Sequence, residues 1–150
     1  MNDTKLELIV QNFITIMPLF QKKLIRRNCG FAHDTFNHSQ FQIMAVLKDT
    51  GKQPISEVAK KLLISTPNMT KLLNKLIDED MIERFPDQKD RRIINIDLTE
   101  KGHTYLDAKF ENVKLTLKER LSPLPDGQKD KLLISLENLK EVLTEISSED

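Results

Sequence analysis

The stretch PISEVAKKLLISTPNMTKLLNKLIDEDMIERFPDQKDRRIINIDL, residues 54–98, decides the fold class. Its first half carries apolar residues at helical spacing, which predicts one helix over residues 54–63 and a second over residues 65–80. Pro67 suits the first turn of the second helix, because the N–H that proline lacks has no partner there. This half therefore predicts two short helices joined by a tight turn.

The second half of the stretch predicts a β-hairpin. Residues 81–85 are expected to form one strand, and the alternation of apolar and polar residues predicts a second strand over residues 94–98. The polar, basic tip PDQKDRR, residues 86–92, joins them. Two helices followed by a basic hairpin are the layout of a winged helix-turn-helix. In that layout one helix enters the major groove of DNA and hairpin arginines reach the adjacent minor groove.

Further helices are predicted on both sides of this stretch. The apolar spacing indicates helices over residues 4–28, 38–49 and 99–121, and a last helix that starts at Asp126. Thr99 is expected to cap the third of them. Pro18 should bend the first of them, because its ring removes one backbone donor. The fold class is therefore mainly α with a small β-hairpin wing, in the order α-α-α-α-β-β-α-α.

The composition is that of one globular domain, residues 1–150. Hydrophobic residues make up 39% and charged residues 31%, which excludes a disordered chain. No apolar run approaches the ~20 residues of a membrane-spanning helix, and the N-terminus lacks the pattern of a secretory signal. The lone cysteine, Cys29, cannot form an intrachain disulfide, which fits a reducing compartment. We therefore expect a cytoplasmic protein without a membrane partner.

The formal net charge is zero, but the charges are distributed unevenly. Residues 52–92 carry 9 basic and 7 acidic side chains, whereas residues 123–150 carry 3 and 7. This distribution predicts a basic edge that contacts DNA and an acidic opposite end, with modest non-specific affinity for the duplex.

The second helix of the stretch has a polar face without acidic residues over its first three turns. Asn and Thr can read base edges and Lys can reach guanine or phosphate, whereas an ordinary surface helix mixes Glu with Lys. Taken alone, this helix fits either interpretation, and the basic hairpin favours DNA. The candidate DNA-contacting residues are Ser65, Thr66, Asn68, Thr70, Lys71, Asn74 and Lys75 on the helix, and Lys89, Asp90, Arg91 and Arg92 on the hairpin.

Residues 37–102 resemble the MarR family of bacterial transcriptional regulators. The wing signature of that family is Asp-x-Arg, five residues, Leu-Thr, and Gly three residues after the Thr. The present chain has DRR at residues 90–92, LT at 98–99 and Gly102. The segments ISEVA and STPNMTKL, at residues 55–59 and 65–72, are similar to the family's two DNA-binding helices.

The resemblance implies a role for individual residues. Arg92 matches the arginine that enters the minor groove, and Asp90 matches the carboxylate that orients it. Lys71 matches a basic position in the major groove where the family more often has Arg. Asp80 stands where the family usually has Gly, and Asp tolerates the left-handed conformation well enough for the turn to survive.

The resemblance also implies a homodimer on a palindromic operator. The DNA-binding lobe would span residues 37–98, and the helices over residues 4–28 and 99–147 would interleave with those of a second copy. The family commonly binds a small-molecule effector between these regions, so the leading hypothesis is a repressor that such an effector releases. The candidate pocket residues, which are also ordinary core types, are Phe13, Met17, Phe36, Phe41 and Met44.

Motifs of catalysis are missing from the sequence. It contains no Gly-rich phosphate loop, nucleophile elbow, His-Glu-x-x-His motif or kinase motif, so we expect neither an enzyme nor a cofactor. Cys29, His33, Asp34 and His38 lack the spacing of zinc ligands, so no metal site is expected. Two alternatives stay open: a winged-helix protein-interaction module that binds no DNA, and a thiol-responsive regulator that acts through Cys29.

Overall fold

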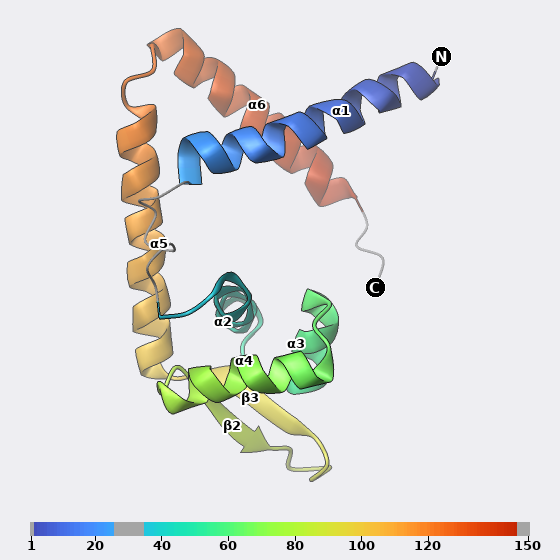
Figure 1. The fold of residues 1–150 in the computed structure, drawn as a ribbon, viewed down its shortest axis with the longest axis vertical. Helices are drawn as coiled ribbons and strands as arrows, with labels where there is room; N and C mark the ends of the chain where they lie inside the picture. The colour runs from blue at the N-terminus through green and yellow to red at the C-terminus, as the bar shows by residue number, and fades with distance from the viewer. Residues whose placement is uncertain (1, 26–34, 147–150) are drawn as a thin grey trace.

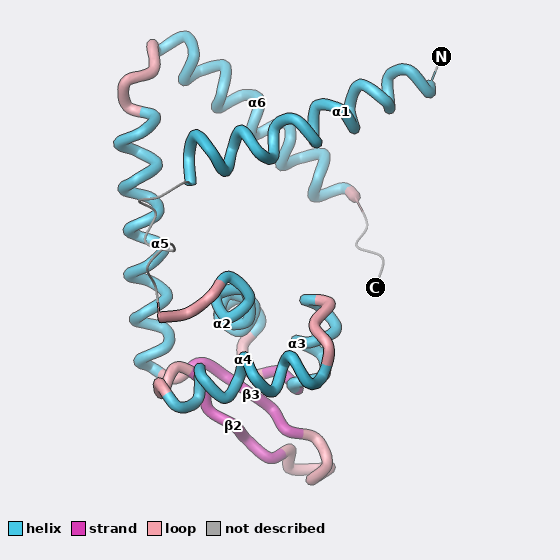
Figure 2. Tube along the Cα trace, in the orientation of Figure 1, coloured by secondary structure: helices cyan, strands magenta, loops and turns pink. Residues whose placement is uncertain are grey.

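The computed structural model of the chain describes residues 2–25 and 35–146. Its elements are α1 (Asn2–Phe20), the π-helix η1 (Gln21–Ile25), α2 (His38–Thr50), β1 (Gln53–Pro54), α3 (Ile55–Leu62), α4 (Thr66–Asp78), β2 (Ile82–Pro86), β3 (Ile94–Leu98), α5 (Glu100–Leu121) and α6 (Asp126–Glu145). In Figure 1, α5 runs along one side and joins a lower lobe, made of α2, α3, α4 and the hairpin, to α1 and α6 at its other end. Helices predominate and the strands form a small wing (Figure 2), which confirms the predicted fold class.

The strands form one antiparallel sheet in the order β1-β3-β2. β2 and β3 form the predicted hairpin, with Ile82 opposite Leu98 and Arg84 opposite Ile96. The predicted order of elements was wrong in omitting β1, which pairs Gln53 with Ile96. Its two residues are too few to produce the alternation by which a strand is predicted.

The start of α2 is fixed by a capping box. The side chain of Asn37 accepts a hydrogen bond from the Gln40 backbone N–H at 2.9 Å, and the Gln40 side chain accepts one from the Asn37 N–H. Gln40 is buried, and its Nε2 also donates to the carbonyl oxygen of Leu72 at 3.3 Å. This residue therefore ties α2 to α4.

The hydrophobic core lies in the lower lobe. Residues of α2, α3, α4, the wing strands and the beginning of α5 form this core, so the lobe has a hydrophobic core of its own. Five apolar residues of α4 are expected to face inward; Met69, Leu73 and Leu76 are buried, and Leu72 and Ile77 are partly buried against the core. The buried apolar side chains are Phe36, Phe41, Ile43, Met44, Leu47, Val58, Met69, Leu73, Leu76, Met81, Ile82, Ile96, Leu98 and Leu106.

Thr99 joins the end of α4 to the beginning of α5. As predicted, it caps α5: its hydroxyl accepts the N–H of Gly102 at 2.9 Å and donates to the carbonyl of Asp80 at 2.6 Å. The Thr99 N–H donates to the carbonyl of Met81 at 3.0 Å. Asp80 has φ 61°, which confirms that an aspartate occupies the left-handed turn.

The predicted helix over residues 4–28 is helical as far as the structure describes it, but its hydrogen-bond pattern changes near the end. The α-helical pattern ends at Phe20 and a π-helical turn follows to Ile25, while residues 26–28 lie outside the described ranges. Pro18 lies just before this change, and a missing backbone donor is a common cause of such irregularity.

Leu63 has an unusual position at the turn between α3 and α4. The helix predicted over residues 54–63 ends one residue earlier, because Leu63 is left-handed, with φ 54° and ψ 41°, and its side chain is 94% exposed. A left-handed conformation strains a residue that has a Cβ, and glycine would remove that strain. This gain outweighs the cost of glycine's greater freedom in the unfolded chain. We therefore expect Leu63→Gly to raise the free energy of unfolding by about 0.5 kcal/mol in urea denaturation. Leu63→Ala, which keeps the Cβ, should bring no such gain, and a decrease in stability with glycine would contradict the account.

Candidate nucleic-acid interface

α4 presents one polar face to solvent and buries the other. Ser65 has an extended conformation just before the helix, and Pro67 lies in the first turn, as the sequence predicts. The structure corrects the predicted bounds, residues 65–80, to Thr66–Asp78. The first turn contains no acidic residue. The seven helix residues predicted to contact DNA are all exposed: Ser65, Thr66, Asn68, Thr70, Lys71, Asn74 and Lys75.

The first part of α4 and its last part differ in what their side chains contact. Lys71 has no hydrogen bond or ion pair with any other described part of the chain, so its ammonium group is free to meet a duplex. Lys75 donates to the carbonyl of Thr35 and lies 5.7 Å from the centre of the Phe36 ring. Asn74 accepts a hydrogen bond from Arg84 at 3.3 Å. Asn74 and Lys75 therefore each have one group engaged within the chain, whereas the other Lys75 donors and the Asn74 amide stay available for DNA.

The wing tip positions an arginine at its surface. Arg92 Nε and Nη2 donate to the two carboxylate oxygens of Asp90, both at 3.0 Å. The Arg92 backbone N–H adds a third hydrogen bond to the same carboxylate, at 3.0 Å. The Arg92 side chain is 90% exposed, against 35% for Asp90. The fork therefore fixes the plane of the guanidinium group while the group itself faces solvent.

The same contacts shift the pKa values of the two groups apart. Hydrogen bonds from the Arg92 side chain and backbone hold the pKa of Asp90 below its usual 3.8. The carboxylate in turn raises the pKa of Arg92. Because the pKa of Asp90 is lowered, the fork is fully formed above the unfolded-state pKa. It is lost only as the pH falls through the lower, folded value.

We expect the carboxyl carbon of Asp90 to titrate below pH 3.8 in an NMR experiment on the wild-type chain. In Arg92→Ala the titration should move upward, because the guanidinium group that does most to lower the pKa of Asp90 is gone. Arg91→Ala removes the same charge from the neighbouring residue and should leave the midpoint in place. Equal midpoints in all three chains would show that the fork does not persist in solution.

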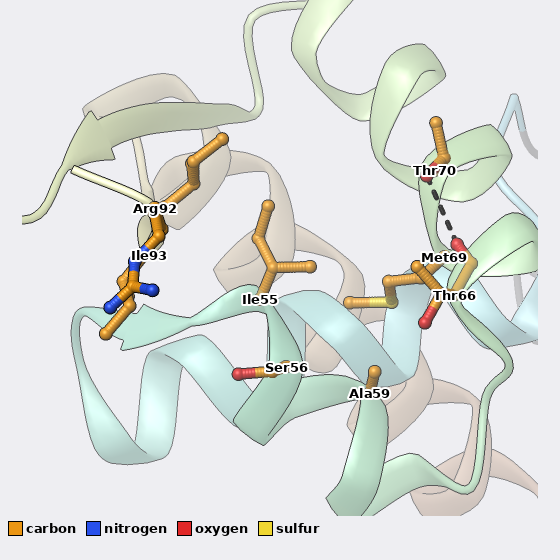
Figure 3. Close-up of a pocket in the computed structure, with 9 residues that line it drawn as sticks. Ile55, Ser56, Ala59, Thr66, Met69, Thr70, Arg92 and Ile93 are labelled. Carbon is orange, nitrogen blue, oxygen red and sulfur yellow. Dashed lines mark hydrogen bonds between the residues drawn. The ribbon is translucent and has the colours of Figure 1, made fainter. Parts of the chain in front are cut away.

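A cavity of about 280 Å³ lies between the wing and the helices α3 and α4. Figure 3 shows Ile55 and Ser56 of α3, Thr66 and Thr70 of α4, and Arg92 of the wing around it. The Thr70 hydroxyl donates to the carbonyl of Thr66 at 3.1 Å. Arg92 therefore lies on the same side of the lobe as the first turn of α4, so the structure brings Thr66, Thr70 and Arg92 of the predicted interface together.

The predicted pocket residues fall into two separate groups. Phe36, Phe41 and Met44 are buried in the core of the lobe, and Tyr105 of α5 lies against the rings of Phe36 and Phe41. Phe13 and Met17 are on α1, where both are exposed. The structure therefore does not gather these five residues in one cavity, and their role in effector binding stays a prediction.

The other predicted chemistry lies mostly outside the described ranges. Cys29, His33 and Asp34 belong to the segment 26–34, and only His38, at the start of α2, is described. Within residues 2–25 and 35–146, no group of three or more His, Cys, Asp or Glu side chains is placed to hold a metal ion. No helix of these ranges has the length and apolar character that a membrane crossing requires.

Sequence reasoning missed two residues of this region. Arg84 on β2 reaches Asn74 of α4, and Asp87 organises the wing tip through hydrogen bonds. Both occur in a polar stretch whose local pattern predicts only a strand and a turn. The basic character of the hairpin could have drawn attention to Arg84. The hydrogen bonds of Asp87 could not be predicted, because they depend on the folded conformation of the wing tip.

The lobe is a winged helix-turn-helix, with α3 and α4 as the paired helices and the β2–β3 hairpin as the wing. Comparisons with known proteins specify the class. The MarR family model matches residues 36–94. The chain is 30% identical over 118 residues to the transcriptional repressor MprA of Escherichia coli, covering 77% of this chain and 67% of that protein. The chain therefore belongs to the MarR family of transcriptional regulators, which are not enzymes.

Two further matches agree with this assignment. The HTH-type transcriptional regulator YkoM of Bacillus subtilis is 30% identical over 101 residues, which cover 67% of this chain and 66% of that regulator. A mutant of Escherichia coli MarR, solved in complex with operator DNA, has a TM-score of 0.61 at 20% identity, covering 87% of this chain and 94% of that one. This second likeness shows the fold. The chain spans between 62% and 66% of the length of three curated relatives that it matches.

Proposed function

We propose that the chain binds double-stranded DNA as a homodimer at a palindromic operator and represses transcription until a small-molecule effector releases it. The observation that carries the DNA-binding part is the Asp90–Arg92 fork, exposed beside the acid-free beginning of α4. A guanidinium group held in one plane suits the narrow minor groove, whose negative potential attracts arginine. The helix beside it would then lie in the major groove.

The beginning of α4 supports this arrangement. Ser65 makes no side-chain hydrogen bond to the first turn, so the N–H groups of that turn and the positive end of the helix dipole can face a phosphate. Lys71 lies one turn further along, exposed and without a partner in the described chain. Two of the candidate contacts near the beginning of the helix, Thr66 and Thr70, line the same cavity as Arg92.

The homodimer is supported by apolar surface that the single chain leaves uncovered. Phe13 and Ile14 on α1 are 43% and 69% exposed, and α6 has no buried residue at all. Monomers rarely expose contiguous apolar patches of more than a few hundred Å². A second copy of the chain is the simplest cover for this surface, and two-fold symmetry would match a palindrome. The exposed apolar residues of α6 are Leu133, Ile134, Leu136, Leu139, Val142 and Leu143.

The effector part of the proposal needs only a difference in affinity. A ligand that binds better at one separation of the two α4 helices than at another shifts the dimer towards that separation. α5 is the element that joins the lobe to α1 and α6 (Figure 1), so movement of this helix would change that separation. MprA, one of the relatives, is described as a repressor, which favours repression here.

Selection from a library of random duplexes tests the DNA-binding part of the proposal. The full chain should enrich an inverted repeat whose half-sites are about 10 bp apart, centre to centre, with AT-rich flanks where the wing meets the minor groove. Arg92→Ala in a parallel selection should lose the preference for AT-rich flanks. If no sequence is enriched, the protein-interaction module without DNA binding becomes the better interpretation.

A further inference from the structure

Asp87, at the start of the wing tip, accepts three hydrogen bonds. Its Oδ2 accepts the backbone N–H groups of Lys89 and Asp90, both at 3.1 Å. Its Oδ1 accepts Nδ2 of Asn95, from β3, at 3.1 Å. These donors hold the pKa of the Asp87 carboxyl below its usual 3.8, so the group is ionised at neutral pH. One carboxylate thus binds both the turn and the strand that follows it.

The backbone of the tip closes around the same residue. The Asp87 N–H donates to the carbonyl of Ile93 at 3.0 Å, and the Ile93 N–H donates to the carbonyl of Asp90 at 3.0 Å. The turn between Asp87 and Ile93 is therefore held by hydrogen bonds at both ends and from within. The conformation of this turn therefore sets the position from which the Asp90 side chain extends.

Asp90 is the link between this turn and Arg92. Its backbone N–H is bound by Asp87, and its carboxylate binds the Arg92 guanidinium group. Arg92 is 90% exposed, and its described side-chain hydrogen bonds go to Asp90 alone. The direction of Arg92 therefore depends on Asp90, and the placement of Asp90 depends on Asp87.

We propose that Asp87 is a positioning residue for DNA binding, which fixes the wing tip so that Asp90 holds Arg92 towards the minor groove. The inference rests on the proposed function, in which Arg92 contacts DNA. Asp87 itself does not need to touch the duplex. Its effect passes through Arg92, so it should disappear when Arg92 is absent.

A double-mutant cycle with Asp87→Ala and Arg92→Ala tests this dependence. The probe is a fluorescein-labelled duplex with the inverted repeat that the selection enriches, and anisotropy measures its affinity. Asp87→Ala alone should weaken binding about fivefold, and in the Arg92→Ala background it should weaken binding no further. Asp87→Asn keeps an acceptor oxygen for the two backbone N–H groups but turns an amide group towards Asn95, so it should weaken binding less than Asp87→Ala does.

NMR titration of Asp90 provides a readout that does not involve DNA. In Asp87→Ala the midpoint of the Asp90 carboxyl should move up towards its usual value, because a displaced Asp90 no longer holds Arg92. A residue that merely stabilised the fold would not raise this midpoint in a folded variant, because loss of the neighbouring Asp87 charge alone can only lower it. Circular dichroism checks the fold, and if Asp87→Ala is unfolded, Asn95→Ala removes one donor to the carboxylate and serves in its place.

The outcomes separate the two proposals. If Arg92→Ala binds like the wild type, the proposed function of the wing fails. If Arg92→Ala weakens binding but Asp87→Ala does not, only the positioning role of Asp87 is overturned. An equal weakening by Asp87→Ala in both backgrounds would show that Asp87 acts independently of Arg92, which also overturns the inference.

Discussion

Gly102→Ala should lower the free energy of unfolding by about 3 kcal/mol, at the upper end of what overpacking usually does. A Cβ at this position would lie 2.2 Å from the carbonyl oxygen of Met81 and 3.1 Å from Cδ2 of Leu98. The Met81 carbonyl cannot easily move away, because it accepts the N–H of Thr99, the residue that caps α5. The alanine would therefore force α5 away from the wing. Denaturation in urea measures the decrease.

Gly127 provides a matched control for this substitution. It also lies in the first turn of a helix, α6, but a Cβ there would meet no atom within 4 Å. Gly127→Ala should leave the stability unchanged or raise it by up to about 1 kcal/mol, because alanine favours helix. If the stability of Gly102→Ala is within about 0.5 kcal/mol of the wild type, the close packing of α5 on Met81 is not present in solution.

The double substitution Leu139→Glu and Leu143→Glu should convert the proposed dimer into a monomer. These side chains of α6 are 38% and 48% exposed in the single chain, so they are available for burial against a second copy. Each buried leucine is worth about 1.5–3 kcal/mol, and burying a glutamate is unfavourable in addition. We expect the dissociation constant of the dimer to rise at least ~100-fold in sedimentation equilibrium.

Leu63→Glu is the control for the dimer experiment. Leu63 is more exposed than either residue of α6, but it lies in the turn between α3 and α4, in the other lobe. The Leu63→Glu variant should sediment with an unchanged mass, twice that of the single chain. If the α6 variant also sediments as a dimer, the apolar surface of α6 has another role. A wild-type monomer at micromolar concentration would remove the two-fold operator model.

Local pattern was sufficient to predict most of the fold. Helical spacing identified α4 and its buried residues, the alternation of Ile94, Ile96 and Leu98 identified β3, and Thr99 was recognised as a cap. Each of these features depends on residues that are close in sequence. β1 was not predicted, because it is short and is defined by its pairing with β3, which lies some forty residues further along the chain.

The candidate site could be predicted in composition but not in its contacts. The pairing of Asp90 with Arg92 involves residues two apart, which a family signature can identify. Lys75 and Thr35 are 40 residues apart, so no local pattern indicates that this lysine donates a hydrogen bond within the chain. The same holds for Asn74 and Arg84, which only the packing of the wing against α4 brings together.

The central claim is that Arg92 of the wing contacts DNA, and the salt dependence of binding tests it most directly. Wild-type chain, Arg92→Ala and Lys114→Ala should be titrated against the selected duplex over a series of salt concentrations. Lys114→Ala removes the same charge from the exposed side of α5 and serves as the control. Arg92→Ala should weaken binding about tenfold and lower the slope of log K against log salt by about 0.9 for each phosphate that is no longer neutralised, while Lys114→Ala matches the wild type. Wild-type affinity and slope in Arg92→Ala would contradict the account.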